Sequence, residues 1–410
     1  MSMSHGVGSR PRVAVLCSVY FAGSHADVIL SRLLDGYVWD GEHQDARIEV
    51  ASVYLEQLGS SDNLPVSRTD IGTKTLTSHG IPLFKSVGEA LSLGTTGVNV
   101  DGVLIIGEHG DYGWGEFDQK LYPRRRMFDA GVAAMVAGGR TVPIFVDKHL
   151  AWSFVDAASM VSDADRLGIP LLAGSSLPVT WRIPQGAQWP LGSPVTGAAV
   201  VSIAASEPGC RPTEMSGFHN LEFIQALLER RRGGETGVAA VTAVTGAKIA
   251  GSLAAVPRDA ELLARALEEL SITTDDPISF ISNSADDLFL IDYKDGTTLT
   301  VVNLDLPAGH RVAGAVRGPE TTVAMEAWLG DPDHGNFTFL TRQIESLMLT
   351  GRSPYPVTRT LLTTGVMEAA LRARHERRTV PTPHLSLTYE AVDLIPDTGV
   401  DRPIPQASTH

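Results

Sequence analysis

The stretch R-V-A-V-L-C-S-V-Y-F-A-G-S-H-A-D at residues 12–27 reads as an apolar strand that passes through a turn into the start of a helix. Dinucleotide-binding domains begin in this way, with a turn of the spacing G-x-G-x-x-G. The three glycines would stand at Cys17, Val19 and Ala22, and all three are replaced. In such turns the glycines allow a tight bend, close approach to the pyrophosphate and close helix–strand packing. The chain therefore has the outline of a nicotinamide enzyme with an altered cofactor loop.

The composition is that of a globular protein with more than one domain. The chain has 410 residues, of which 43% are hydrophobic and 20% charged, and this length exceeds one ordinary core. Its net charge of −14 disfavours nucleic acid and anionic membranes as partners. The polar segment 1–11 lacks the apolar core of a signal peptide, and two cysteines cannot make a disulfide framework. We expect a cytoplasmic protein whose partner is a small-molecule substrate.

The order of apolar segments predicts two kinds of sheet. Strand and helix patterns alternate over the first 150 residues, which favours an α/β, Rossmann-like parallel sheet. Strand-like segments then follow with fewer helices, 278–283 among them, and favour an α+β domain with a large, mostly antiparallel open sheet. The predicted parts are a disordered segment over 1–11, the Rossmann-like domain over 12–175, an α+β substrate and oligomerisation domain over 176–395, and a flexible tail over 396–410.

Two polar motifs follow apolar segments at places where chemistry is expected. V-D-K-H at 146–149 ends a predicted strand, and M-S-G-F-H-N-L-E at 215–222 begins a predicted helix. Over roughly residues 12–310 the order of these pieces resembles the Gfo/Idh/MocA oxidoreductase family. In that family a strand ends in E-K-P, and a helix with the motif D-x-G-x-H-x-x-D carries a histidine that transfers a proton. The resemblance implies that Lys148 and His219 are catalytic.

The departures from the family pattern add potential metal ligands. His149 replaces the proline of E-K-P, and G-E-H-G-D-Y at 107–112 opens an insertion that ends near Arg126. Imidazole and carboxylate groups suit zinc, manganese, iron or nickel. A lysine beside such an ion would lose its proton more readily and act as a base. The predicted ligands of a divalent metal ion are Glu108, His109, His149 and Glu222.

Further residues are candidates for binding the substrate or a cofactor. The predicted substrate-binding residues are Tyr112, Arg124, Ser175 and Arg182, because arginine binds carboxylate or phosphate groups well and small hydroxyl residues suit a cleft wall. If NAD(P) is used, phosphate contacts would come from the start of the first helix, and an acidic residue after the second strand would hold the ribose. The predicted cofactor-binding residues are Ser18, Tyr20, His25 and Glu56.

Three functions remain open from the sequence. The first is an enzyme that has lost nicotinamide use and performs metal-assisted or Lys/His acid–base chemistry, such as elimination, isomerisation or hydrolysis, on a small polar, sugar-like or acidic substrate. The second is an NAD(P)-dependent sugar or polyol dehydrogenase with a degenerate glycine loop. The third is a non-catalytic binding protein. The family resemblance also implies a homodimer or homotetramer that pairs through the open sheet.

Overall fold

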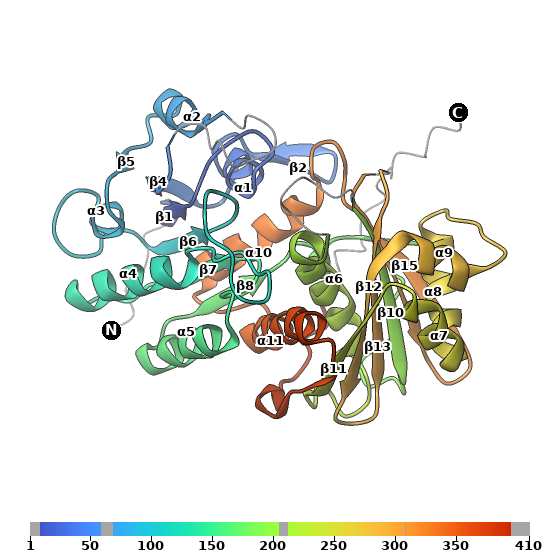
Figure 1. Ribbon diagram of the computed structural model, residues 1–410. Coiled ribbons are helices and arrows are strands. Elements are labelled where there is room, and N and C mark those ends of the chain that lie inside the picture. Colours follow the sequence, from blue (N-terminus) through green and yellow to red (C-terminus); the bar gives the residue numbers. More distant parts are fainter. Residues whose placement is uncertain (1–8, 59–68, 205–211, 308, 395–410) are drawn as a thin grey trace.

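The computed structural model of the chain (Figure 1) describes residues 9–58, 69–204, 212–307 and 309–394. The predicted flexible tail, and all but the last three residues of the predicted disordered segment 1–11, lie outside this range. Two sheets organise the chain, and the long helices lie on their faces (Figure 1). None of the helices in the described residues has the length and apolar character of a membrane span.

The first sheet is parallel, as predicted. It has six strands in the order β5-β4-β1-β6-β7-β8, and every neighbouring pair runs in the same direction. The carboxyl ends of these strands therefore share one edge, where ligands collect in sheets of this type. The strands are β1 (Arg12–Cys17), β4 (Glu49–Leu55), β5 (Leu83–Phe84), β6 (Gly102–Ile106), β7 (Ile144–Asp147) and β8 (Leu171–Gly174).

Helices cover both faces of the first sheet because its strands are apolar on both sides. One face packs against α1 (His25–Leu34) and α10 (Asn336–Thr350), so a helix from near the end of the described chain completes the first core. The other face packs against α3 (Val87–Ser92), α4 (Arg124–Ala137) and α5 (Phe154–Leu167). The remaining elements of this half are α2 (Gly72–Ser78) and the hairpin of β2 (Tyr37–Trp39) and β3 (Glu42–Gln44).

The second sheet confirms the predicted large, mostly antiparallel sheet. Eight strands lie in the order β16-β11-β12-β13-β10-β14-β15-β9, and only the pair β10–β13 is parallel within the described part of the chain. The strands are β9 (Arg182–Ile183), β10 (Gly197–Ala204), β11 (Val238–Thr245), β12 (Ala285–Tyr293), β13 (Thr298–Asp305), β14 (Arg311–Arg317), β15 (Thr322–Ala327) and β16 (Val380–Pro381).

Helices also cover both faces of the second sheet. On the side facing the first sheet lie α6 (Pro212–Leu228) and α11 (Val357–Glu376). On the far side lie α7 (Lys248–Ala255), α8 (Pro257–Glu269) and α9 (Pro277–Ser284) (Figure 1). The far side is thus covered by the chain's own helices, and the predicted pairing through an open sheet face stays a prediction. The short helices η1 (Leu177–Val179) and η2 (Pro383–Leu385) complete the description.

The segment 278–283 is a helix, which corrects the predicted strand. Its β-branched and aromatic residues favour a strand by propensity, but the residues before it set a helix start. The Asp276 side chain accepts a hydrogen bond from the Ser279 N–H, and Pro277 occupies the first helical turn. A capping side chain followed by proline is a strong helix-starting arrangement, and here it outweighs propensity.

Helix α11 packs so closely that its glycine, Gly365, has no room for a side chain. A Cβ at Gly365 would overlap Leu385 Cδ2 and lie 2.7 Å from Phe154 Cδ2. By contrast, a Cβ at Gly131 in α4 would meet no atom within 4 Å. Alanine has a higher helix propensity than glycine at both positions, but only at Gly365 would its Cβ also clash with neighbouring side chains. Comparing the two substitutions therefore distinguishes helix propensity from the steric cost of packing.

We expect Gly365→Ala to lower the free energy of unfolding by about 1–3 kcal/mol, because it overpacks the contact of α11 with its neighbours. Gly131→Ala is the matched control and should raise that free energy by roughly 0.5–1 kcal/mol. Urea unfolding followed by circular dichroism measures both. Equal effects of the two substitutions would contradict the tight packing of α11.

Candidate active site

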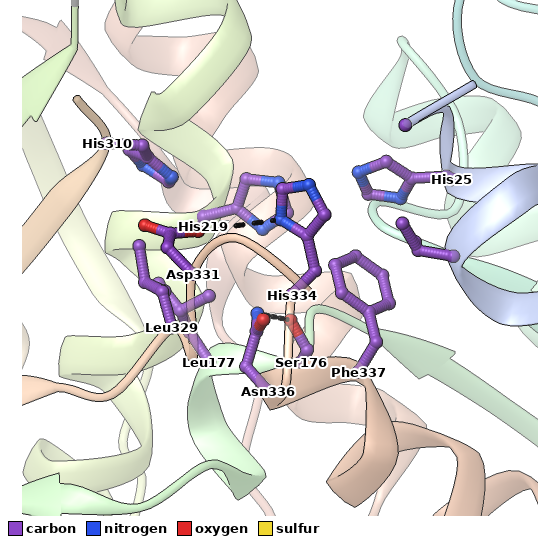
Figure 2. Close-up of a pocket in the computed structure, with 12 residues that line it drawn as sticks. His25, Ser176, Leu177, His219, His310, Leu329, Asp331, His334, Asn336 and Phe337 are labelled. Atoms are coloured by element: carbon purple, nitrogen blue, oxygen red, sulfur yellow. Dashed lines mark hydrogen bonds and ion pairs between the residues drawn. The ribbon is translucent and has the colours of Figure 1, made fainter. Parts of the chain in front are cut away.

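The carboxyl edge of the first sheet faces α6, and a small cavity lies there. Its volume is about 140 Å³, and residues from both halves of the chain line it. Figure 2 shows four of its histidines, from α1, α6 and the loops after β13 and β15, around this space. The lining residues are Gly23, His25, Val28, Ser176, Leu177, His219, His310, Leu329, Asp331, His334, Asn336 and Phe337.

The cavity adjoins a larger groove along α1. This groove has a volume of about 1100 Å³ and runs between α1, the β2–β3 hairpin and the loop that joins β15 to α10. Several residues line both the cavity and the groove. The shared residues are Gly23, Val28, His310, Leu329, Asp331 and His334.

His219 reaches the cavity from α6, as a catalytic histidine would. Its Nδ1 lies 2.5 Å from the hydroxyl of Ser175, which directly follows β8. Burial lowers the pKa of His219 well below its ordinary value, and the positive charge of Lys148 lowers it further. The imidazole is therefore neutral at neutral pH. His310 behaves in the same way, since burial and Lys148 lower its pKa to about 4.

Lys148 belongs to a buried cluster of charges at the same edge. Its Nζ lies 2.5 Å from Oε1 of Glu108, whose second oxygen accepts from Arg124. Burial alone would raise the pKa of Glu108, but the charges of Lys148 and Arg124 outweigh it and hold that pKa well below its ordinary value. Lys148 thus forms an ion pair with a carboxylate, and its positive charge lowers the pKa values of His219 and His310.

The loops that carry this cluster bend sharply. Lys148 has a φ of 60° and His109 a φ of 63°, both in the left-handed region that non-glycine residues seldom adopt. The N–H of Lys148 donates to the carbonyl of Gly174 at 3.2 Å, which ties the end of β7 to that of β8. Backbone conformations of this kind persist where surrounding contacts hold them, and they are concentrated at functional sites.

The four predicted metal ligands do not converge on one point. Glu108 is occupied by Lys148 and Arg124, and His149 Nε2 lies 3.1 Å from Arg124 Nη1. Glu222 accepts from the hydroxyl of Thr363 at 2.6 Å. Among the described residues, no three histidine, cysteine or acidic side chains are grouped as a metal site requires. The structure gives the predicted metal ion no support.

The predicted ribose-binding acid, Glu56, is occupied by other side chains of the protein. Arg126 donates two hydrogen bonds to its carboxylate, at 2.7 and 2.9 Å, and the hydroxyl of Tyr112 donates a third at 2.8 Å. A Cβ placed on Gly110 would meet the Tyr112 ring at 2.8 Å and Val19 Cγ1 at 3.2 Å. The insertion after β6 therefore packs on the side chain that replaces the second loop glycine.

The other predicted cofactor contacts are divided between the interior and the cavity. Ser18 is buried, and its hydroxyl donates to the carbonyl of Glu108 at 2.5 Å. Tyr20 is also buried, and its hydroxyl has no hydrogen-bond partner among the described residues. His25 lines the cavity. The predicted phosphate contacts are thus not presented together on one surface.

Of the predicted substrate-binding residues, Ser175 alone contacts a side chain that lines the cavity. Arg124 is fully buried under Glu108, and Tyr112 is bonded to Glu56. Arg182 lies in β9 and donates to Gln188; burial lowers the pKa of its guanidinium to about 10. The tyrosine and the two arginines therefore lie outside the cavity wall.

Sequence reasoning missed several cavity residues that come from late in the chain. They sit in two loops and at the start of α10, with no motif spacing, and α10 packs on the first sheet together with α1. A hydrogen bond of 2.8 Å joins Asn336, the first residue of α10, to Ser176. The segment D-P-D-H-G at 331–335 is the one hint, as a polar cluster that contains a histidine. The missed residues are His310, Asp331, His334 and Asn336.

Comparison with solved structures identifies the class of fold. GenD2 from gentamicin A biosynthesis, in complex with NAD, matches with a TM-score of 0.60 at 17% identity, over 93% of this chain and 99% of that one. Myo-inositol 2-dehydrogenase from Lactobacillus plantarum matches with a TM-score of 0.55 at 10% identity, over 91% of this chain and 99% of that one. A myo-inositol dehydrogenase from Corynebacterium glutamicum gives 0.54 and 10%, over 91% and 99% of the two chains.

The chain therefore has the oxidoreductase fold of the Gfo/Idh/MocA-type dehydrogenases, as the sequence resemblance implied. At these identities the likeness establishes the fold. No protein-family model matches the chain, and no curated protein sequence matches it either.

We expect Glu108→Gln to lower the free energy of unfolding by about 3–5 kcal/mol, because it leaves the charges of Lys148 and Arg124 buried without a carboxylate. Since the pKa of Glu108 is depressed in the folded protein, its contribution is complete at neutral pH and is lost as acid protonates it. Urea unfolding at neutral and acidic pH measures both effects.

The matched control for this experiment is Glu268→Gln, which breaks the exposed pair of Arg265 and Glu268 on α8. Exposed pairs contribute at most about 1 kcal/mol. If the two substitutions cost the same, the buried charge cluster does not have the role assigned to it.

Proposed function

We propose that the protein is an enzyme that performs acid–base chemistry on a small polar substrate in the cavity between its two sheets, without a nicotinamide. The observation that carries this proposal is the position of His219, a buried neutral imidazole that lines the cavity. Lys148 adds a positive charge that lowers the pKa of that imidazole. Lys148 lies outside the cavity wall. An imidazole in the wall and a buried cation behind it suit the stabilisation of negative charge on a substrate oxygen.

The geometry also changes the expected role of Lys148. With Glu108 at 2.5 Å from its Nζ, the side chain acts as the cation of an ion pair. Its part in the reaction is then to favour an enolate or similar anion in the cavity, while a histidine moves the proton. Abstraction of a proton next to a carbonyl, followed by isomerisation or elimination, fits these groups.

Loss of nicotinamide use is supported by the surroundings of the altered loop. Glu56, which would hold the adenine ribose, already accepts three hydrogen bonds from Tyr112 and Arg126. Val19, in place of the glycine that lets the backbone approach the pyrophosphate, packs next to Gly110 and Tyr112. A dinucleotide lying along this edge would have to displace these contacts.

The second candidate is an NAD(P)-dependent sugar or polyol dehydrogenase. The observation that favours it is the likeness over nearly the whole chain to GenD2, which was solved in complex with NAD. In this function Lys148 and His219 would serve hydride transfer to or from a bound nicotinamide.

Titration with NADH and NADPH separates the two candidates. We expect no saturable change in nucleotide fluorescence at micromolar concentrations, because the protein's own side chains hold the ribose-binding acid. GenD2 is a suitable positive control. Saturable binding of either nucleotide, with quenching or enhancement of its fluorescence, would support the dehydrogenase.

Solvent exchange tests the acid–base proposal before the substrate is identified. A panel of inosose, ketose and hydroxy-acid compounds is incubated with the protein in D2O, and deuterium at carbon is measured by NMR and mass spectrometry. We expect exchange into at least one compound, and a loss of about 100-fold or more in His219→Gln. His375→Gln, at an exposed position of α11, should keep the rate. Exchange that survives in His219→Gln would contradict the proposal.

A further inference from the structure

The cavity has a second imidazole, His25, to which the proposed function gives no role. It is the first residue of α1, and the preceding Ser24 caps this helix by accepting a hydrogen bond from the Asp27 N–H. Nδ1 of His25 lies 2.7 Å from Oδ2 of Asp147, the last residue of β7. Asp147 is fully buried, and its other oxygen has no partner among the described residues.

This pairing decides which nitrogen of His25 carries a hydrogen. An ionised carboxylate only accepts hydrogen bonds, so a neutral His25 ring bonded to it carries its hydrogen on Nδ1 and has its lone pair on Nε2. In the described part of the chain Nε2 has no hydrogen-bond partner, and the ring points into the cavity (Figure 2). A buried aspartate that orients an imidazole in this way is the arrangement of a general base.

Neighbouring rings hold the imidazole of His25 in place. The ring of Phe337 meets it edge to face at a centroid distance of 5.0 Å, and His109 lies at 5.9 Å on another side. The side chain is thus fixed by α10, by the loop after β6 and by β7. Such support is what a catalytic group requires to stay in a productive orientation.

The contacts of His219 fit the complementary tautomer. The Leu177 N–H donates to Oγ of Ser175 at 3.2 Å, and the hydroxyl hydrogen is available to Nδ1 of His219 at 2.5 Å. With the hydroxyl as donor, Nδ1 accepts and Nε2 carries the hydrogen of the neutral ring. In this arrangement His25 offers a lone pair to the cavity and His219 an N–H.

We propose that His25, oriented by Asp147, is the catalytic base of this protein, and that the substrate has a C–H bond next to a carbonyl whose oxygen binds the N–H of His219. The proposal rests on the proposed acid–base function and names the group that takes the proton. The two ring centroids are 5.9 Å apart, so a single small molecule in the cavity reaches both.

The proton and electron pair are accounted for in this step. The C–H bond breaks, its proton goes to Nε2 of His25, and its electron pair becomes the carbon–carbon double bond of the enolate. The enolate oxygen keeps the hydrogen bond from Nε2 of His219, and Asp147 balances the positive charge of the His25 imidazolium. Return of a proton from His25 to carbon completes an exchange or an isomerisation with no redox partner.

The tautomers are measurable on the full chain without a substrate. Two-bond ¹H–¹⁵N spectra of protein labelled with ¹⁵N-histidine distinguish the protonated from the unprotonated ring nitrogen, and His25→Gln assigns the signals. We expect hydrogen on Nδ1 of His25. Asp147→Asn should move it to Nε2, because the amide can donate to Nδ1. Asp331→Asn, which removes a carboxylate 3.8 Å from His334, should leave the His25 tautomer unchanged.

The exchange assay in D2O tests the catalytic role. His25→Gln should lose the exchange about 100-fold or more. Asp147→Asn should lower kcat and leave KM unchanged, because Asp147 is a positioning residue that acts through His25. Asp129→Asn, at an exposed pair with Arg125, is the control for activity. Thermal unfolding of each variant reports whether it has folded.

The failures of the two proposals are distinguishable. Exchange lost in His219→Gln and kept in His25→Gln would overturn the role of His25 and leave the proposed function standing. Exchange kept in both variants would overturn both. Hydrogen on Nε2 of His25 in the unaltered protein would overturn the inference even where no compound of the panel exchanges, and hydrogen on Nδ1 supports it.

Discussion

The buried carboxylate of Glu108 is the constraint on which the site depends. A charge that is buried away from water has to be paired. Removing one partner of a buried pair lowers the free energy of unfolding by more than the intact pair adds to it. Glu108 therefore holds Lys148 at the end of β7 and Arg124 at the start of α4. These contacts fix the loops after β6 and β7, and with them the position of Asp147. The orientation of His25 follows from that position, so the cavity is shaped by charge pairing as much as by apolar packing.

The proposed function would place a new activity on the fold of the dehydrogenases. The overall fold is that of the dehydrogenases, and the catalytic roles of Lys148 and His219 are predictions from the sequence motifs. Side chains of the chain itself, Tyr112 and Arg126, take the hydrogen bonds of Glu56. A fold of this type keeps its ligand site at the carboxyl edge of the sheet while the chemistry changes.

The sequence predicted the architecture better than the site. Alternation of apolar segments was enough for the parallel sheet, since buried strands and amphipathic helices have distinct periods. It failed at 278–283, where the cap at Asp276 outweighs strand propensity. The motifs predicted catalytic roles for Lys148 and His219, which stay predictions. Whether a carboxylate binds a metal or an arginine depends on neighbours distant in the chain, which the motifs do not contain. For Glu108 that neighbour is Arg124, and for His25 it is Asp147.

The junction of the cavity with the groove along α1 has a consequence for how molecules enter and leave. The two spaces share walls at Gly23 and His334. In the proposed function, reactant and product would pass along the helix while the two sheets stay packed, and turnover would need no hinge between the halves of the molecule. The inner end of such a substrate would be compact, whereas its outer end would have room in the groove toward the β2–β3 hairpin.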